Sequence, residues 1–238
     1  MTELLKLEGI VINKFDIKES DRFLKIFTPN MGKIDILIKG IKKSKNRDKI
    51  AADVLSYCKI IAYKKNGNFI GSSIELIEDY EFIRKDLDKV GIILYMFSIL
   101  NNTLNDWEQN NELFQFLCKS LKYINKEEKK YKYITLLLCF MNKIIVLEGI
   151  SYILENGKNF SIEHSYVGKT EYPNSFLLSE EEYKIILAIK NRKIKNLLKN
   201  KINIKYLFNI LEIYEKYLNY HLEIKLNVKN YILEEITW

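Results

Sequence analysis

The chain has 238 residues, of which 47% are hydrophobic and 29% are charged. This composition can supply a sizeable core, and it excludes a mainly disordered chain, a collagen-like chain and a disulfide-dense miniature domain. The formal net charge is +7, and residues 33–67 account for all of it with ten basic against three acidic side chains, since the rest of the chain is balanced.

The first 80 residues have the pattern of short β-strands. Ile34, Ile36 and Ile38 recur at every second position, which is the period of a strand with one buried face. Asn66-Gly67 is the strongest hairpin signal, because both residues accept the positive φ of a type I′ turn. The pattern predicts strands at residues 4–15, 23–28, 33–39, 54–64 and 68–77. Such a set fits a small closed or partly open barrel, of which the OB-fold is one form.

After residue 79 the hydrophobic period lengthens from two residues to about 3.6, the period of an α-helix. Long apolar segments without proline predict helices at residues 85–104, 108–124 and 132–148. Ser179 and Glu182 form a capping-box pattern that predicts the start of another helix. Residues 203–225 are amphipathic and predict the last helix. Residues 150–178 have no clear period, so we expect an irregular insert or small subdomain there.

The change of period predicts a two-part α+β protein. We expect an N-terminal OB-fold barrel over residues 1–80 and an α-helical domain over residues 81–238. No segment reaches the roughly 18 to 20 apolar residues that span a bilayer. The N-terminus contains acidic residues and lacks the pattern of a signal peptide. These observations predict a cytoplasmic protein without membrane contact.

Signatures of enzymatic chemistry are absent from the sequence. It contains no Gly-rich phosphate loop and no HExxH or GxSxG motif. The histidines, His164 and His221, lie far apart in the sequence. Cys58, Cys118 and Cys139 lie far apart in apolar runs, so we expect buried, reduced thiols rather than disulfides or metal ligands. The sequence therefore predicts a non-enzymatic protein without a cofactor or a bound metal.

The basic excess is densest at residues 39–49, directly after the third predicted strand. Because the fields of clustered charges add within a Debye length, such a segment suits a polyanion, and we expect it to be a mobile loop. Lysine is a flexible point charge that suits phosphate better than base edges, which favours backbone binding with little sequence preference. The predicted nucleic-acid-binding residues are Arg22, Lys33, Lys39, Lys42, Lys43, Lys45, Arg47, Lys49, Lys64 and Lys65.

A second charge asymmetry lies at residues 183–211, which hold eight basic residues and no acidic one. A receptor for an acidic peptide with apolar end residues needs an apolar groove and flanking cations. The apolar candidates are Ile185, Ile186, Leu197, Leu198 and Leu207. The predicted partner-binding cations are Lys190, Arg192, Lys193, Lys195 and Lys199. The alternative is that the lysines are solvated while the apolar residues all pack inward.

Four segments near the N-terminus share an order and spacing with one known family. They are Gly9-Ile10-Val11-Ile12, Glu19-Ser20-Asp21-Arg22, Phe27-Thr28-Pro29-Asn30-Met31-Gly32-Lys33 and Lys39-Gly40-Ile41-Lys42-Lys43-Ser44. Together they resemble the N-terminal domain of RecO, a family of bacterial recombination mediators. Residues 217–226 resemble the last helix of that family. The resemblance is firm over residues 1–80 and weaker from there to the end.

The resemblance implies an OB-fold, a helical domain that docks partners, and no catalysis. It implies binding of single- and double-stranded DNA, strand annealing, and help in loading RecA onto DNA coated by the single-stranded DNA-binding protein. The implied partners are RecR and the acidic tail of that protein, with RecA involved indirectly and a nucleoid association. Many members carry a Cys-rich zinc site, but residues 154–165 contain no cysteine. We therefore expect no zinc here.

Charge alone leaves two other functions open. An RNA-binding OB module fits the same pattern, because RNA and DNA are both polyphosphates. A protein-interaction scaffold fits it as well, if the lysine excess only reflects a biased genome. Titration of matched DNA and RNA strands separates the first alternative from DNA binding.

Overall fold

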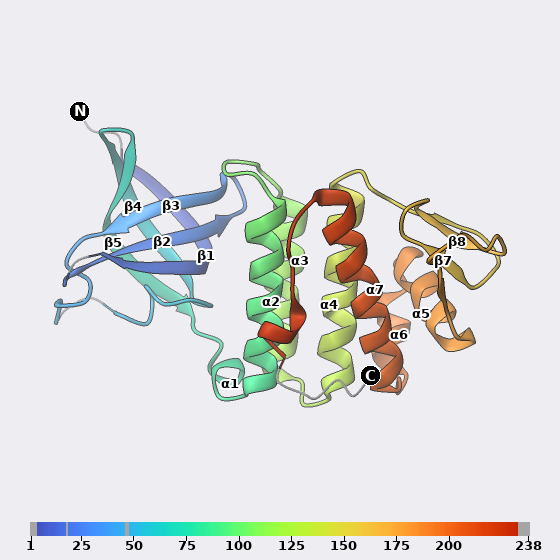
Figure 1. Cartoon of the computed structure of the whole chain (residues 1–238). Coiled ribbons are helices and arrows are strands. Elements are labelled where there is room, and N and C mark those ends of the chain that lie inside the picture. Colours follow the sequence, from blue (N-terminus) through green and yellow to red (C-terminus); the bar gives the residue numbers. More distant parts are fainter. Residues whose placement is uncertain (1–3, 18, 46–47, 233–238) are drawn as a thin grey trace. The chain divides into compact units, whose positions relative to one another are not determined.

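The computed structural model describes residues 4–17, 19–45 and 48–232 (Figure 1). Its N-terminal part is a closed barrel of five strands, which confirms the predicted OB-like barrel. The strands are β1 (Leu4–Ile17), β2 (Asp21–Thr28), β3 (Gly32–Ile38), β4 (Tyr57–Lys65) and β5 (Asn68–Glu78). Asn66-Gly67 forms the turn between β4 and β5, and both residues have positive φ as predicted.

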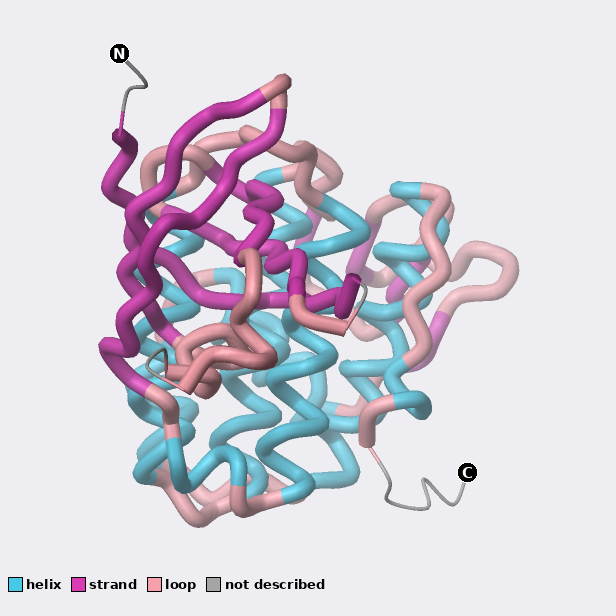
Figure 2. The backbone as a smooth tube through the Cα atoms, turned by 90° about the vertical axis from the view of Figure 1, so that its left-hand side faces the viewer, coloured by secondary structure: helices cyan, strands magenta, loops and turns pink. Residues whose placement is uncertain are grey.

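The barrel closes because β1 takes part in two strand pairings. Leu4 in its first half lies opposite Tyr63 of β4, and Phe15 in its second half lies opposite Phe23 of β2. A register shift between Val11 and Asn13 marks a bulge, and such a bulge bends the strand. β3 pairs antiparallel with β2 and parallel with β5, which completes the order β1-β2-β3-β5-β4. Figure 2 shows the strands in magenta.

The rest of the chain is mainly helical, which confirms the α+β class. The helices are α1 (Glu81–Arg84), α2 (Leu87–Thr103), α3 (Asn111–Lys126), α4 (Lys130–Leu147), α5 (Glu180–Lys190), α6 (Ile194–Lys199), α7 (Ile204–Leu222) and the 3-10 helix η1 (Val228–Asn230). Ser179 caps α5 through the predicted capping box. The Ser179 hydroxyl accepts a hydrogen bond from the Glu182 backbone amide, and the Glu182 carboxylate accepts one from the Ser179 backbone amide. None of the helices in the described ranges is long and apolar enough to cross a membrane.

Packing divides the chain into two compact units. The first, the barrel unit, contains Met1–Lys85 and Leu104–Asn125, and the second contains Asp86–Thr103 and Lys126–Trp238. Most of α3 therefore belongs to the barrel unit, although it follows the boundary expected near residue 80. Aromatic packing is the reason, since the ring of Phe114 meets the rings of Phe27 at 5.6 Å and Tyr57 at 6.3 Å, edge to face.

Residues 150–178 contain a small sheet where the sequence shows no period. Its strands are β6 (Ile153–Leu154), β7 (Asn159–Ser161), β8 (Tyr166–Gly168) and β9 (Phe176–Leu177), in the order β6-β8-β7-β9. Strands this short cannot display a period of two residues. A Cβ at Gly157 would lie 2.0 Å from the carbonyl carbon of Gly168, so the segment folds tightly enough to require glycine.

Candidate nucleic-acid interface

The turn between β1 and β2 holds the long connection between β3 and β4 against the barrel. The Asp21 carboxylate accepts a hydrogen bond from the Gly40 amide at 2.8 Å. The Lys42 amide donates to the Ser20 carbonyl at 3.1 Å. Gly40 has a φ of +68°, which glycine adopts without strain. The Glu19-Ser20-Asp21-Arg22 motif therefore supports the basic segment.

Arg22 fixes the other end of the same connection. Its Nη1 donates to the Ala52 carbonyl at 2.9 Å, and its Nε donates to Asp16 at 2.7 Å. Hydrogen bonds from Arg22 and Lys42 hold the pKa of Asp16 at about 2. The Arg22 side chain is only 13% exposed. The sequence predicted that Arg22 contacts phosphate. We instead assign Arg22 to positioning the connection.

The connection between β3 and β4 is packed against the barrel at both of its ends. Ile41, Ala51 and Ala52 are no more than 1% exposed and belong to the barrel core. Apolar side chains at both ends leave the exposed lysines between them, Lys45 and Lys49, displayed to solvent. Anchoring of the two ends limits how far these lysines can move from the barrel, which reduces the conformational entropy lost on binding.

The motif Thr28-Pro29-Asn30-Met31-Gly32-Lys33 also has a structural role. Lys33 is 3% exposed, and its Nζ lies 3.9 Å from Asp106. Burial lowers the pKa of its ammonium group. A Cβ at Gly32, whose φ is +64°, would lie 2.3 Å from the Glu108 carbonyl oxygen. Because a buried amine cannot reach a phosphate, we remove Lys33 from the nucleic-acid-binding set.

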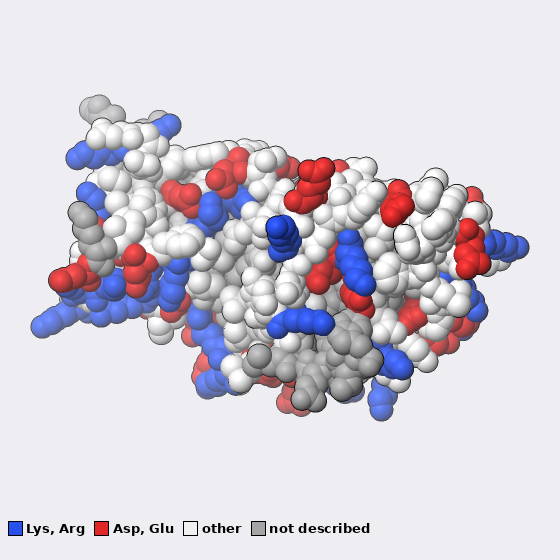
Figure 3. All heavy atoms as spheres, viewed as in Figure 1, with Lys and Arg blue, Asp and Glu red and all other residues white. Residues whose placement is uncertain are grey.

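Of the other predicted cations, some form ion pairs with nearby carboxylates and others do not. Lys42 lies 3.2 Å from Asp16, and Lys43 lies 2.7 Å from Glu19, so nearby carboxylates offset both charges. Lys39 is exposed, and Arg47 lies outside the described residues. In Figure 3, Lys and Arg side chains gather along the lower edge of the barrel unit, with Asp and Glu among them.

Four predicted lysines are exposed and form no ion pair with any residue of the described ranges. They are Lys45 and Lys49 on the β3–β4 connection, and Lys64 and Lys65 at the β4–β5 hairpin. We call them the barrel lysines. OB-folds bind oligonucleotides with the face of their second and third strands and with the loops that adjoin it, including the β4–β5 loop. The barrel lysines therefore provide positive charge both at that hairpin and on the β3–β4 connection.

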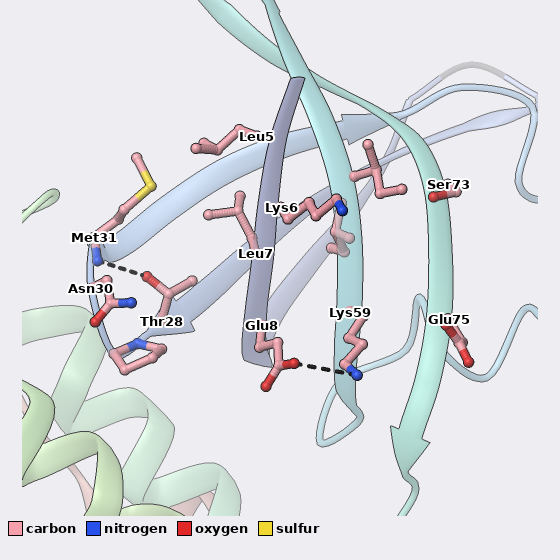
Figure 4. Close-up of a pocket in the computed structure, with 13 residues that line it drawn as sticks. Leu5, Lys6, Leu7, Glu8, Thr28, Asn30, Met31, Lys59, Ser73 and Glu75 are labelled. Atoms are coloured by element: carbon pink, nitrogen blue, oxygen red, sulfur yellow. Dashed lines mark hydrogen bonds and ion pairs between the residues drawn. The ribbon is translucent and has the colours of Figure 1, made fainter. Parts of the chain in front are cut away.

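The barrel also carries a groove of about 710 Å³ beside the first half of β1 (Figure 4). Leu5 and Leu7 contribute apolar lining, while the charged side chains at its rim are balanced. Lys59, for example, lies 3.5 Å from Glu8. The groove therefore lacks the excess of cations that a polyanion requires.

The second predicted cation cluster, at α5 and α6, is only partly available. Lys190 is half-buried, donates a hydrogen bond to the Tyr152 carbonyl, and places its Nζ 4.2 Å from the centroid of the Tyr152 ring. Burial lowers the pKa of its ammonium group. The remaining cations of the set are exposed, namely Arg192, Lys193, Lys195 and Lys199.

The apolar residues expected to line a groove beside these cations mostly face the core. Ile185, Ile186, Leu197 and Leu207 are no more than 8% exposed, and Leu198 is half-buried. Their helical spacing places them on the packed faces of α5, α6 and α7. The structure therefore presents exposed cations at this place without a groove built from those four side chains.

The cysteines are free and buried, as expected from their apolar surroundings. Burial raises the pKa of Cys58 and of Cys139 to about 12, and that of Cys118 to about 11. All three thiols are therefore protonated at neutral pH, which makes them poor nucleophiles and poor metal ligands.

Within the described ranges, no three His, Cys, Asp or Glu side chains converge as metal ligands. His164 stacks on Tyr172 with ring centroids 3.8 Å apart, and His221 lies 2.9 Å from the Ile162 carbonyl. A structural zinc site needs about four such ligands. We predict that metal analysis of the purified protein finds far less than one zinc per chain, and one tightly held zinc per chain would contradict this.

Models of one family match both parts of the chain. The model described as "Recombination protein O N terminal" matches residues 1–80, and "Recombination protein O C terminal" matches residues 84–230. The matched ranges meet near the end of β5, where the barrel strands give way to helices.

Relatives named "DNA repair protein RecO" support the same assignment. The chain is 30% identical to that of Acetivibrio thermocellus over 52% of this chain and 50% of the relative. It is 29% identical to that of Clostridium perfringens, over 64% and 61%, and 31% identical to that of Mycoplasma capricolum, over 58% and 57%. The matched region spans about half to three fifths of the length of these relatives. With both family models matching, the chain belongs to the recombination protein O (RecO) family.

Proposed function

We propose that this chain acts in DNA repair and recombination as a non-enzymatic protein that binds DNA without sequence preference. The observation that carries the proposal is the set of exposed barrel lysines, which form no ion pair with described residues. Membership of the RecO family supports the repair role. Lysine charges attract the phosphates of any sequence, so the binding is to the backbone.

A salt titration tests this proposal directly. If the barrel lysines make four phosphate contacts, the log of the affinity for single-stranded DNA should fall with log salt at a slope of about −2.8, and that for duplex at about −3.6. Fluorescence anisotropy with labelled strands of each form measures both slopes. Binding that does not respond to salt would contradict the proposal, and tighter binding of a matched RNA strand would favour the RNA alternative.

Removal of a neighbouring carboxylate should strengthen DNA binding. Glu19 is 87% exposed at its side chain and offsets the charge of Lys43. An exposed ion pair is worth about 0.2 to 1 kcal/mol, so we expect Glu19→Gln to raise DNA affinity by about 1.5- to 5-fold at low salt. Glu163→Gln, an exposed residue of the second unit, is the matched control. Equal affinity of Glu19→Gln and the parent would show that Lys43 lies outside the interface.

We further propose that the chain anneals strands and assists loading of RecA, with RecR and the single-stranded DNA-binding protein as partners. The exposed cations of the α5–α6 region support a contact with the acidic tail of the latter protein. Because the apolar residues nearby are buried, this contact would be mainly electrostatic and sensitive to salt. Annealing of complementary strands in the presence of the chain tests the first activity.

Charge reversal at α5–α6 tests the tail contact. We expect the combined variant Arg192→Glu, Lys193→Glu and Lys195→Glu to weaken binding of an acidic tail peptide by at least about tenfold, because like charges replace attractive ones. DNA binding by the barrel should stay unchanged. Reversal of three other exposed lysines, Lys129, Lys169 and Lys225, is the control. Undiminished peptide binding by the combined variant would place the tail site elsewhere.

A further inference from the structure

The first half of β1 has one edge that pairs with no other strand of the described ranges. β1 pairs with β4 from Leu4 to Ile10, and it pairs with β2 only from Ile10 onward. The second edge of residues 4–9 therefore lies open, although the barrel as a whole closes. We call it the free β1 edge. An open strand edge is a template for a further strand, because its backbone amides and carbonyls lack partners.

The hydrogen bonds of Val11 show which backbone groups point to the free β1 edge. The Val11 amide donates to the Ser56 carbonyl at 2.9 Å, and the Val11 carbonyl accepts from the Leu55 amide at 2.8 Å, directly before β4. Both groups of Val11 therefore point to the β4 side. Because successive residues of a strand point their backbone groups to opposite edges, Lys6 and Glu8 point theirs away from β4.

The groove of Figure 4 follows the free β1 edge. Both faces of the strand line it, since Lys6 and Glu8 are exposed on the outer face while Leu5 and Leu7 pack on the core side. Figure 4 shows Leu5 and Leu7 on the side of β1 that faces Met31, with Lys6 on the opposite side. A hollow that both faces of one strand line lies along the edge of that strand, which leaves room for a second strand.

We propose that the free β1 edge binds the same edge of a second copy of this chain. In an antiparallel pairing centred on Leu7, Lys6 of each copy lies opposite Glu8 of the other, and Leu7 lies opposite its own counterpart. Lys6 and Glu8 then exchange the backbone hydrogen bonds that their free amides and carbonyls require. Such an interface has two-fold symmetry, because each copy contributes the same residues.

Charge complementarity identifies the second copy as the partner. Lys6 is exposed and forms no ion pair with any residue of the described ranges. A lysine on a strand edge normally prevents pairing between copies, because like charges would meet. Here the antiparallel register places Glu8 opposite it instead. The Glu8 carboxylate lies 3.5 Å from Lys59 and accepts a hydrogen bond from the Tyr57 hydroxyl, and its oxygens can accept more.

Sedimentation velocity of the full chain without DNA tests the proposal. We expect the parent chain to change from monomer to dimer as its concentration rises. Lys6→Glu places like charges at both symmetric pairs, so it should weaken the dimer by at least about fourfold, and Glu8→Lys should do the same. Lys49→Glu is the matched control, because Lys49 is exposed in the same unit, and it should leave the dimer unchanged.

Exchange of the two charges separates pairing of the edges from an effect on the fold. The combined variant Lys6→Glu, Glu8→Lys again has opposite charges facing each other, so it should recover most of the dimer affinity of the parent. A mixture of the two single variants should form a heterodimer, because one chain then carries two acidic side chains and the other two basic ones.

Three results would overturn the proposal. The first is a parent chain that stays monomeric up to about 1 mM, at the weak end of specific affinities. The second is equal dimerisation of the parent and both single variants. The third is a loss that neither the combined variant nor the mixture recovers. The dimer does not depend on DNA, so a failure of the salt titration would overturn the proposed function and leave this inference standing.

Discussion

Reversal of all four barrel lysines to glutamate should weaken single-strand binding by at least about 1000-fold at low salt. Each substitution removes one phosphate contact and adds a like charge near the phosphates, and about 1 kcal/mol from each lysine already gives this factor. The salt slope should approach zero in the same variant, because the released counterions came from these contacts. The fold should be retained, since all four side chains are exposed.

A matched charge-reversal variant separates local from overall charge. Lys129, Lys169, Lys201 and Lys225 are exposed and lie in the second unit. Their reversal changes the net charge by the same amount, so a purely global effect would weaken binding equally in both variants. We expect little change in this control beyond a reduced long-range attraction, which salt screens. Similar losses in both variants would contradict a site on the barrel.

The two pairs of barrel lysines also report on the path of the strand. Lys45 and Lys49 belong to the β3–β4 connection, and Lys64 and Lys65 belong to the β4–β5 hairpin. If one strand contacts both places, each double reversal should account for part of the loss, and their logarithmic effects should approximately add. An effect confined to one pair would restrict the interface to that segment.

The barrel was predictable because its strands display their burial in the sequence. Ile34, Ile36 and Ile38 alternate with less buried residues, and all three are no more than 1% exposed in the structure. Asn66-Gly67 identified a hairpin through local conformational preference alone. The helices α2, α3 and α4 were predictable for the same reason, since long periodic segments without proline give strong signals.

What the sequence could not supply is the partner of each side chain. Lys33 and Lys45 both lie in the basic N-terminal segment and look alike in the sequence. In the structure Lys33 is buried beside Asp106, whereas Lys45 is exposed. The amphipathic pattern of α3 predicts that one face is buried but not that Phe114 packs on the barrel.

The small sheet of β6 to β9 should depend on aromatic packing around Phe160. Its side chain is completely buried. The Phe160 ring centroid lies 5.0 Å from that of Tyr152 and 5.9 Å from that of Tyr217. The Tyr217 hydroxyl also donates to the Ile150 carbonyl at 2.5 Å, which fixes the start of the segment. In the absence of a metal site among the described residues, this cluster is the main apolar anchor that joins β7 to α7.

Phe160→Ala should therefore lower the free energy of unfolding of the second unit by about 3 to 5 kcal/mol, because it removes a large buried ring and leaves a cavity. Urea unfolding followed by circular dichroism measures this loss. Leu177→Ala, at a β9 side chain that is 78% exposed, should change stability by less than about 0.5 kcal/mol. Added zinc should restore nothing in Phe160→Ala, because the cluster holds the sheet by packing. A loss below about 1 kcal/mol would show that the sheet is held by its backbone ladder and turns instead.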